Sequence, residues 1–152
     1  MSAANWQTAE GRVNTIVRVF DAPRDIVWAA WSDPEHIKHW WGPTGFTNTI
    51  EEFYFRSGGH WRFVMHGPDG TAYDNHNVFV EVVKPERIVI DHIVEPLFRI
   101  HVAFEAIGET TRMTFRQTFE SIETFERVKP YAVPGAMQMF DRFVRHLERT
   151  KR

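Results

Sequence analysis

Residues 98–119 read FRIHVAFEAIGETTRMTFRQTF, and this stretch decides the fold. Gly108 and Glu109 fit the centre of a two-residue turn, which predicts one antiparallel hairpin. On one face of that hairpin the predicted opposed pairs are almost wholly apolar: Phe98–Phe119, Ile100–Gln117, Val102–Phe115 and Phe104–Met113. On the other face Glu105 lies opposite Arg112, an attractive pair. The stretch therefore predicts two strands of an antiparallel sheet that buries one side.

The preceding strand, residues 88–94, can pair with this hairpin in two registers. In one register His92 lies opposite Ile100 and faces the apolar side. A shift by one residue puts His92 opposite His101, as in a metal-binding pair, but sets Asp91 against an apolar neighbour. Because a one-residue slip moves every side chain to the other face, we prefer the first register.

Strands that come earlier in the chain extend the same sheet. The predicted cross-strand pairs there are Phe53–Phe63, Phe55–Trp61, Val78–His92, Val80–Ile90 and Val82–Ile88. Val13–Phe20 is rich in β-branched residues and predicts one more strand at the start. The sequence thus predicts one antiparallel sheet of about seven strands whose apolar side chains share one face.

Helical spacing of apolar residues occurs on both sides of this sheet in the sequence. A short helix is expected from Pro23, with Asp21 or the preceding turn as its cap, and a second from Pro34, which carries two tryptophans and ends before Gly42. Residues 134–149 predict a long amphipathic helix whose apolar stripe packs on the sheet. Its basic residues are expected on the solvated side: Arg142, Arg145, Arg149, Lys151 and Arg152.

The pattern predicts an α+β protein with a single domain, residues 12–150, after an N-terminal extension, residues 1–11. The formal net charge of −2 over 152 residues gives no reason to expect a nucleic acid partner. Without cysteine the chain forms no disulfide or thiolate metal site. Neither a signal peptide nor an apolar run long enough for membrane insertion is visible. We expect a cytoplasmic monomer or small oligomer, a homodimer included.

Histidines are frequent in the chain but match no metal-binding motif. The eight histidines have irregular spacings. His36 and His39 could share one face of a helix, yet the sequence indicates no third ligand. We therefore expect no metal and no other cofactor.

Four motifs occur in order along nearly the whole chain, over about residues 13–147. They are Trp40-Trp41-Gly42-Pro43, RSGGHWRF at 56–63, GPDG at 67–70 and PERIV at 85–89. Together they resemble the activator-of-heat-shock-protein-90-ATPase-like family within the START-like, or SRPBCC, superfamily. The resemblance implies a helix-grip fold, in which a curved antiparallel sheet grips a long C-terminal helix and leaves a cavity.

The chain departs from this family at two positions. Tyr54 stands where Asp is usual, and Ala136 follows Gly135 where a tryptophan is common. Loss of a large aromatic side chain from the gripping helix is expected to widen or reshape the cavity.

A cavity between sheet and helix would hold a hydrophobic or aromatic small molecule. Its expected apolar walls are Trp31, Trp40, Phe53, Trp61, Phe63, Met65, Val78, Ile100, Met137 and Phe140. The predicted registers turn His92 and Gln117 inward, and we also consider His76 and Glu51. Because a buried polar group without a partner costs about 1–3 kcal/mol, these side chains would anchor polar atoms of the ligand.

Two other functions stay open. The superfamily that the chain resembles includes polyketide cyclases and aromatic-modifying enzymes, so an enzyme with His92 or His76 as acid or base is the first alternative. The second is a protein-interaction module that acts on a chaperone. Eukaryotic co-chaperones of this type use an additional N-terminal domain, for which this chain has no room, so we do not expect a chaperone partner.

Overall fold

The computed structural model describes residues 10–150 as seven strands and three helices. The strands are β1 (Val13–Phe20), β2 (Thr47–Phe53), β3 (His60–His66), β4 (Ala72–Val83), β5 (Arg87–His92), β6 (Phe98–Ile107) and β7 (Thr110–Phe119). The helices are α1 (Arg24–Ser32), α2 (Pro34–Ile37) and α3 (Ile122–Thr150). Of the predicted N-terminal extension, residues 1–11, residues 1–9 lie outside the described part of the chain.

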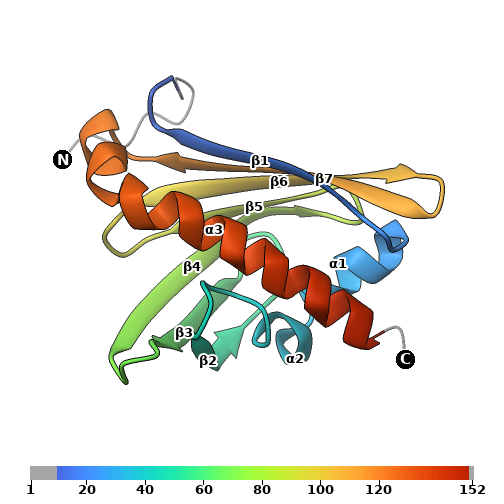
Figure 1. Ribbon diagram of the computed structural model, residues 1–152, viewed down its shortest axis with the longest axis horizontal. Helices are drawn as coiled ribbons and strands as arrows, with labels where there is room; N and C mark the ends of the chain where they lie inside the picture. The colour runs from blue at the N-terminus through green and yellow to red at the C-terminus, as the bar shows by residue number, and fades with distance from the viewer. Residues whose placement is uncertain (1–9, 151–152) are drawn as a thin grey trace.

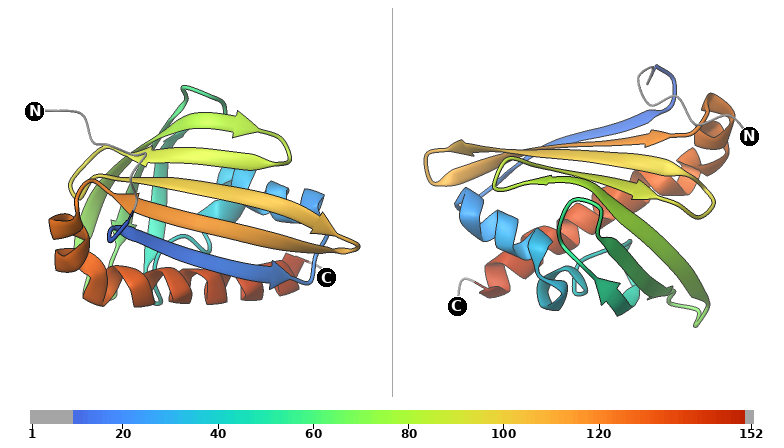
Figure 2. Two further views of the ribbon diagram at one scale, coloured as in Figure 1. Left: turned by 90° about the horizontal axis from the view of Figure 1, so that it is seen from above. Right: turned by 180° about the vertical axis from the view of Figure 1, so that it is seen from behind.

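All the described strands belong to one antiparallel sheet with the order β1-β7-β6-β5-β4-β3-β2. In Figure 1, β2, β3 and β4 turn away from the other strands, so that the sheet curves around α3. Figure 2 shows α3 running beside β1, where Arg18 of the strand and Asp141 of the helix form an ion pair at 3.1 Å. The predicted α+β arrangement, a curved sheet around a long C-terminal helix, is confirmed.

The pairing of β6 with β7 is the one that the sequence predicts. Phe104 lies opposite Met113 on the inner face. On the outer face Glu105 and Arg112 form an ion pair at 2.9 Å. Gly108 has a φ of 59° in the connecting turn, a left-handed conformation that glycine adopts easily. The prediction is confirmed because no bulge interrupts the pairing, so each residue keeps the face that the alternation gives it.

β5 pairs with β6 in a register that differs from the predicted one. His92 lies opposite Phe98, so the strands are offset by two residues from the preferred register. β5 ends at His92 instead of continuing to Val94, because the following loop folds back and brings the carbonyl of Pro96 to 2.8 Å from His92 Nδ1. An offset of two residues preserves the alternation of faces, so the inward orientation of His92 is confirmed.

A β-bulge at Val80 interrupts the pairing of β4 with β5. The extra residue reverses the alternation of faces along the strand. Asn77, and not Val78, therefore lies opposite His92 on the inner face, while Val80 is 40% exposed. The predicted pairs Val78–His92 and Val80–Ile90 are wrong, and the predicted pair Val82–Ile88 is confirmed.

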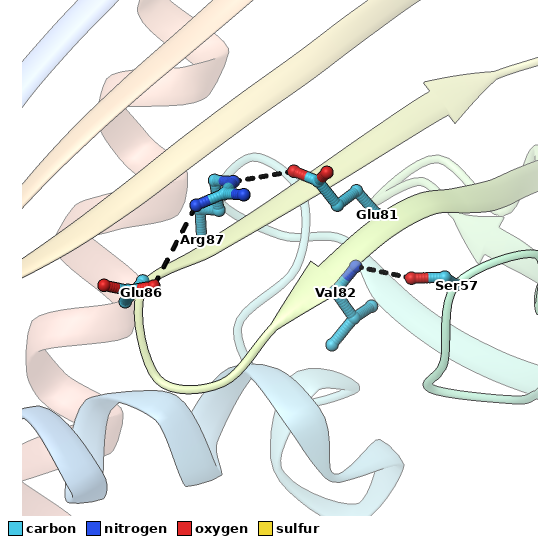
Figure 3. Close-up of polar contacts among 5 residues, drawn as sticks. All are labelled: Ser57, Glu81, Val82, Glu86 and Arg87. Carbon is cyan, nitrogen blue, oxygen red and sulfur yellow. Dashed lines mark hydrogen bonds and ion pairs between the residues drawn. The ribbon is translucent and has the colours of Figure 1, made fainter.

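The loop that precedes β3 lies along β4 at this bulge. The Gly58 N–H donates to the Phe79 carbonyl at 2.6 Å, and the Phe79 N–H donates to the Gly59 carbonyl at 2.8 Å. Figure 3 shows the neighbouring contact, in which the Ser57 hydroxyl accepts a hydrogen bond from the Val82 N–H at 3.0 Å. A Cβ at Gly59 would lie 1.9 Å from a backbone oxygen of the same loop, so this conformation requires glycine. The loop thus satisfies backbone groups of β4 around the bulge.

A second bulge, at Glu51, shifts β2 against β3. Phe53 therefore lies opposite Trp61, and the predicted pairs Phe53–Phe63 and Phe55–Trp61 are wrong. Phe55 follows the end of β2 and packs against Phe79 in the core, with 5.1 Å between the ring centroids. The alternation that the sequence suggests is broken here because one strand carries an extra residue.

The two short helices lie near the predicted positions. α1 has Pro23 as its N-cap, whose carbonyl accepts the N–H groups of Ile26 and Val27 at 3.1 Å each, and the expected cap by Asp21 or the preceding turn stays a prediction. α2 is a single turn, capped by Asp33, whose carboxylate accepts the Glu35 N–H at 2.8 Å. The two tryptophans that were expected on this helix therefore lie in the turn that follows it.

α3 begins at Ile122, well before the predicted start at Pro134. The Ser121 hydroxyl accepts a hydrogen bond from the Thr124 N–H at 3.0 Å and so caps the first turn. The prediction failed because a proline inside a helix removes a backbone hydrogen bond and usually marks a boundary. Pro130 and Pro134 nevertheless lie within α3, and Figure 1 shows its first turns set at an angle to the rest.

An aromatic core fills the space between the sheet and the second half of α3. Trp31 and Trp40 are fully buried, with 4.9 Å between their ring centroids. The Trp40 Nε1–H donates to the carbonyl of Ala30 at 3.1 Å, which satisfies its polar atom. Phe143 of α3 packs on Trp40 at 4.5 Å. This end of the molecule is therefore closely packed.

Candidate functional site

A cavity of about 770 Å³ lies between the inner face of the sheet and the first half of α3. Its lining comes from three parts of the fold. From the strands it includes Phe63, Met65, Ala72, Tyr73, Asp74, Asn75, Asn77, His92, Phe98, Ile100, Phe115, Gln117 and Phe119. From loops it includes Trp41, Gly42, Pro43, Phe46, Glu95 and Pro96, and from α3 Val128, Tyr131, Ala132, Gly135, Ala136 and Met139.

Five residues of the predicted site lie together around this cavity. They are Phe63, Met65, His92, Ile100 and Gln117. Each lies on a central strand, where the predicted face was correct. The expected inward orientation of His92 and Gln117 is therefore confirmed, whereas their role in binding stays a prediction.

Five other aromatic or apolar residues that were expected in the walls do not line the cavity. Four belong to the adjoining core: Trp31, Trp40, Trp61 and Phe140 are almost completely buried, and Phe53 packs against the same cluster. Trp41 takes the place expected for Trp40, because the chain leaves the helix before both residues.

Met137 of α3 does not face the cavity either. It is 45% exposed, whereas its neighbours Ala136 and Met139 line the cavity. Successive residues of a helix point about 100° apart, and this step carries Met137 out of the arc of α3 that faces the cavity. The sequence assigned Met137 to the wrong side of the stripe.

Three further predicted residues lie on other surfaces. His76 is on the outer face, where its Nε2 lies 2.7 Å from Nδ1 of His60. Val78 is also on that face, opposite His60 and Asp91, and Glu51 is exposed at the β2 bulge. The two bulges explain all three errors, because each reverses the faces beyond it.

His92 is the most enclosed titratable group of the cavity lining. Its Nδ1 lies 2.8 Å from the carbonyl of Pro96 and its Nε2 lies 2.7 Å from Oδ1 of Asn75. The ring stacks on Phe98 with 4.3 Å between centroids. Burial lowers the pKa of His92, although the carbonyls of Pro96 and Val94 favour the protonated form. Both nitrogens are thus occupied by protein atoms.

Asn77 was not predicted and is the most distinctive polar group of the site. Its side chain lines the cavity, the residue is 2% exposed, and its Oδ1 accepts no hydrogen bond from any described residue. The bulge at Val80 turns it inward. The alternation Asn75, Asn77, Phe79 is visible in the sequence and could have indicated this face.

Residues 41–46 form one wall of the cavity, and Arg142 of α3 fixes their position. Its Nη1 donates to the carbonyls of Trp41, Gly42 and Pro43 at 3.1, 2.7 and 3.0 Å. Its Nη2 donates to the carbonyls of His39 and Phe46 at 3.1 and 3.0 Å. Arg142 was expected on the solvated side of the helix. It is instead half-buried and holds the loop against α3.

The structure adds His146 of α3 to the pair His36 and His39. Nε2 of His146 lies 2.9 Å from Nδ1 of His36, and its ring stacks on that of His39 at 5.9 Å. Burial, followed by the charge of His36, lowers the pKa of His146 to about 4. Among the described residues, no three His, Cys, Asp or Glu side chains are arranged to hold a metal ion.

Within residues 10–150, no helix is both long and apolar enough to cross a membrane. The curved sheet, the gripping helix and the cavity between them define a START-like, helix-grip protein. The sequence also matches the family described as activator of Hsp90 ATPase homolog 1-like protein over residues 21–148. The chain belongs to this family, as the motifs in its sequence suggested.

Solved structures show the same fold. A protein from Arthrobacter aurescens is 28% identical, with a TM-score of 0.86 over 97% of this chain and 91% of that one. Protein Ms6760 from Mycobacterium smegmatis is 24% identical, with a TM-score of 0.82 over 98% of both chains. CalU16 from Micromonospora echinospora is 20% identical, with a TM-score of 0.65 over 89% of this chain and 75% of that one. No curated protein sequence matches the chain.

Proposed function

We propose that this protein binds a hydrophobic or aromatic small molecule in the cavity between the sheet and α3. The observation that carries the proposal is the cavity itself, whose volume of about 770 Å³ falls in the range of small-molecule sites. Its walls are mostly aromatic and aliphatic, with a few polar side chains among them. Such a surface favours an apolar ligand because binding removes apolar area from water.

Ala136 supports this proposal. It lines the cavity from α3, at the position where the family resemblance leads us to expect a tryptophan. A methyl group leaves open a space that an indole ring would fill. The small side chain is therefore consistent with a site that accommodates a ligand.

The alternatives gain no specific support from the described residues. An acid or base needs a nitrogen that can reach the substrate, but both nitrogens of His92 contact protein oxygens. His76 lies on the opposite face of the sheet from the cavity. The homodimer and the cytoplasmic location stay predictions of the sequence.

The test compares two neighbouring substitutions on α3. N-phenyl-1-naphthylamine, an uncharged aromatic probe, should become fluorescent on binding. We expect Ala136→Trp to lower its affinity about 10-fold or more, since the indole occupies the cavity. Met137→Trp adds the same side chain to the exposed face and should leave affinity within about two-fold.

Circular dichroism must show that both variants keep the native melting transition. The proposal fails if the probe does not bind the unaltered protein. It also fails if the probe binds the folded Ala136→Trp variant as tightly as it binds the unaltered protein.

A further inference from the structure

We infer that the ligand of this cavity is uncharged and carries a hydroxyl group that hydrogen-bonds to Asn77. This inference rests on the proposed function and adds the chemical class of the ligand. It follows from the charges around the cavity, from the contacts of His92 and from the free amide oxygen of Asn77.

The lining contains carboxylates but offers no cation. Among the described residues that line the cavity, Asp74 and Glu95 are acidic, and none is Lys or Arg. Both acidic residues are exposed, so water solvates their charges at the rim. An anionic ligand would leave its hydration shell without gaining a partner of opposite charge. An uncharged ligand avoids this loss.

Cationic side chains close to the walls are directed elsewhere. Arg142 lies behind the wall formed by residues 41–46, and its guanidinium donates to five backbone carbonyls. Lys129 of α3 places its Nζ 5.7 Å from the ring centroid of Phe125. Neither side chain lines the cavity.

His92 does not supply a positive charge to the ligand. Burial lowers its pKa, which favours the neutral imidazole. The carbonyl of Pro96 and Oδ1 of Asn75 occupy its two ring nitrogens. Neither ring nitrogen is therefore left to donate to a ligand.

Asn77 then stands out as the polar group in need of a partner. The residue is 2% exposed, it lies between Trp61 and His92 on neighbouring strands, and its Oδ1 accepts no hydrogen bond from the described residues. A hydroxyl group donates and accepts, so it can pair with the amide in either orientation of the side chain. A ligand carbonyl could accept only from Nδ2 and would leave Oδ1 unpaired, and a carboxylate adds an unpaired charge.

Three probes with the same ring system test the headgroup. 1-Pyrenemethanol, 1-pyrenecarboxylate and pyrene should be titrated at pH 7, with binding followed by energy transfer from tryptophan to pyrene. We expect 1-pyrenemethanol to bind about 10-fold more tightly than 1-pyrenecarboxylate. Asn77→Leu, which keeps the volume, should lower the affinity for 1-pyrenemethanol about 10-fold and leave that for pyrene within about two-fold.

A charge introduced into the lining provides the reciprocal test. Gln117→Arg places a cation in the cavity wall and should raise the affinity for 1-pyrenecarboxylate about 10-fold. This variant keeps the inference testable if Asn77→Leu does not fold.

The inference is overturned if the unaltered protein binds 1-pyrenecarboxylate as tightly as 1-pyrenemethanol. It is also overturned if a folded Asn77→Leu variant keeps its full affinity for 1-pyrenemethanol, or if Gln117→Arg does not favour the carboxylate. These results leave the proposed function intact as long as Ala136→Trp still blocks all three probes. If the affinity of the probes is the same for the Ala136→Trp variant, the probes bind outside the cavity. That result contradicts both the proposed function and this inference.

Discussion

At the scale of single residues, His146 carries the clearest electrostatic consequence of the fold. Its side chain is buried on α3 beside His36, and its pKa is lowered to about 4. In the unfolded chain the pKa is near the ordinary value of 6.5. Between these two values the folded protein keeps His146 neutral while the unfolded chain binds a proton. The contribution of His146 to the free energy of unfolding is therefore fully present above about pH 6.5, and it is lost as the pH drops towards 4.

We predict that the free energy of unfolding decreases by roughly 2–3 kcal/mol between pH 7 and pH 4.5 because of His146. The lowered pKa values of His92 and His76 act in the same direction. His146→Leu should make this decrease smaller by about that amount in urea denaturation at the two pH values. His101→Leu, an exposed change on the outer face, is the matched control. An equally steep decrease in His146→Leu contradicts the assignment.

The orientation of single residues was predictable only where the strands are regular. His92 and Gln117 face inward as expected, because an offset of two residues does not change the face. Asn77 was missed and His76 misplaced because an extra residue in β4 reverses the alternation. At this bulge the loop at Gly59 forms hydrogen bonds with β4. The spacing of apolar residues along one strand gives no information about a contact with another segment.

At the scale of elements, the wall formed by residues 41–46 depends on α3. Arg142 donates hydrogen bonds to carbonyls of residues that lie outside helices and strands. Asn48 adds a contact from β2, donating from Nδ2 to the carbonyls of Trp41 and Lys38 at 2.9 and 3.1 Å. Loss of these donors would leave part-buried carbonyls such as that of Gly42 unpaired, which is costly. The loop is therefore held from two sides.

We predict that Arg142→Met destabilises the protein by about 2–4 kcal/mol, because the methionine keeps the apolar contacts but the five hydrogen bonds to backbone carbonyls are lost. The carbonyls of Trp41 and Pro43 keep a second donor. Arg145→Met removes the same charge at an exposed position of α3 and should change stability by less than about 0.5 kcal/mol. Chemical denaturation of both variants measures the difference. Similar midpoints for the two variants would show that Arg142 does not fix the wall.

Among the elements, the hairpin β6–β7 and the strand β1 were predicted with their correct residues. Their side chains alternate regularly and need no information from distant parts of the chain. The start of α3 could not be predicted in this way, since Pro130 and Pro134 locally disfavour a continuous helix. Packing of its first half around the cavity outweighs that local preference.

At the scale of the whole molecule, the fold separates a packed end from a hollow end. The tryptophans near α1 and the second half of α3 fill the first. The first half of α3 presents small residues such as Ala132, Gly135 and Ala136 to the second. A cavity lowers stability because its walls lose packing contacts. A ligand that fills the space would restore these contacts, so the proposed function and the packing have the same physical basis.

The most direct test locates a bound molecule relative to α3 and the sheet. In isotope-labelled protein saturated with unlabelled 1-pyrenemethanol, intermolecular NOEs should connect the pyrene ring to methyl groups of Ile100, Ala136 and Met139, which line the cavity. No such NOE should reach Val17, which is exposed on the outer face. Ring contacts to Val17, or a saturated protein without contacts to the three cavity methyl groups, would contradict the account.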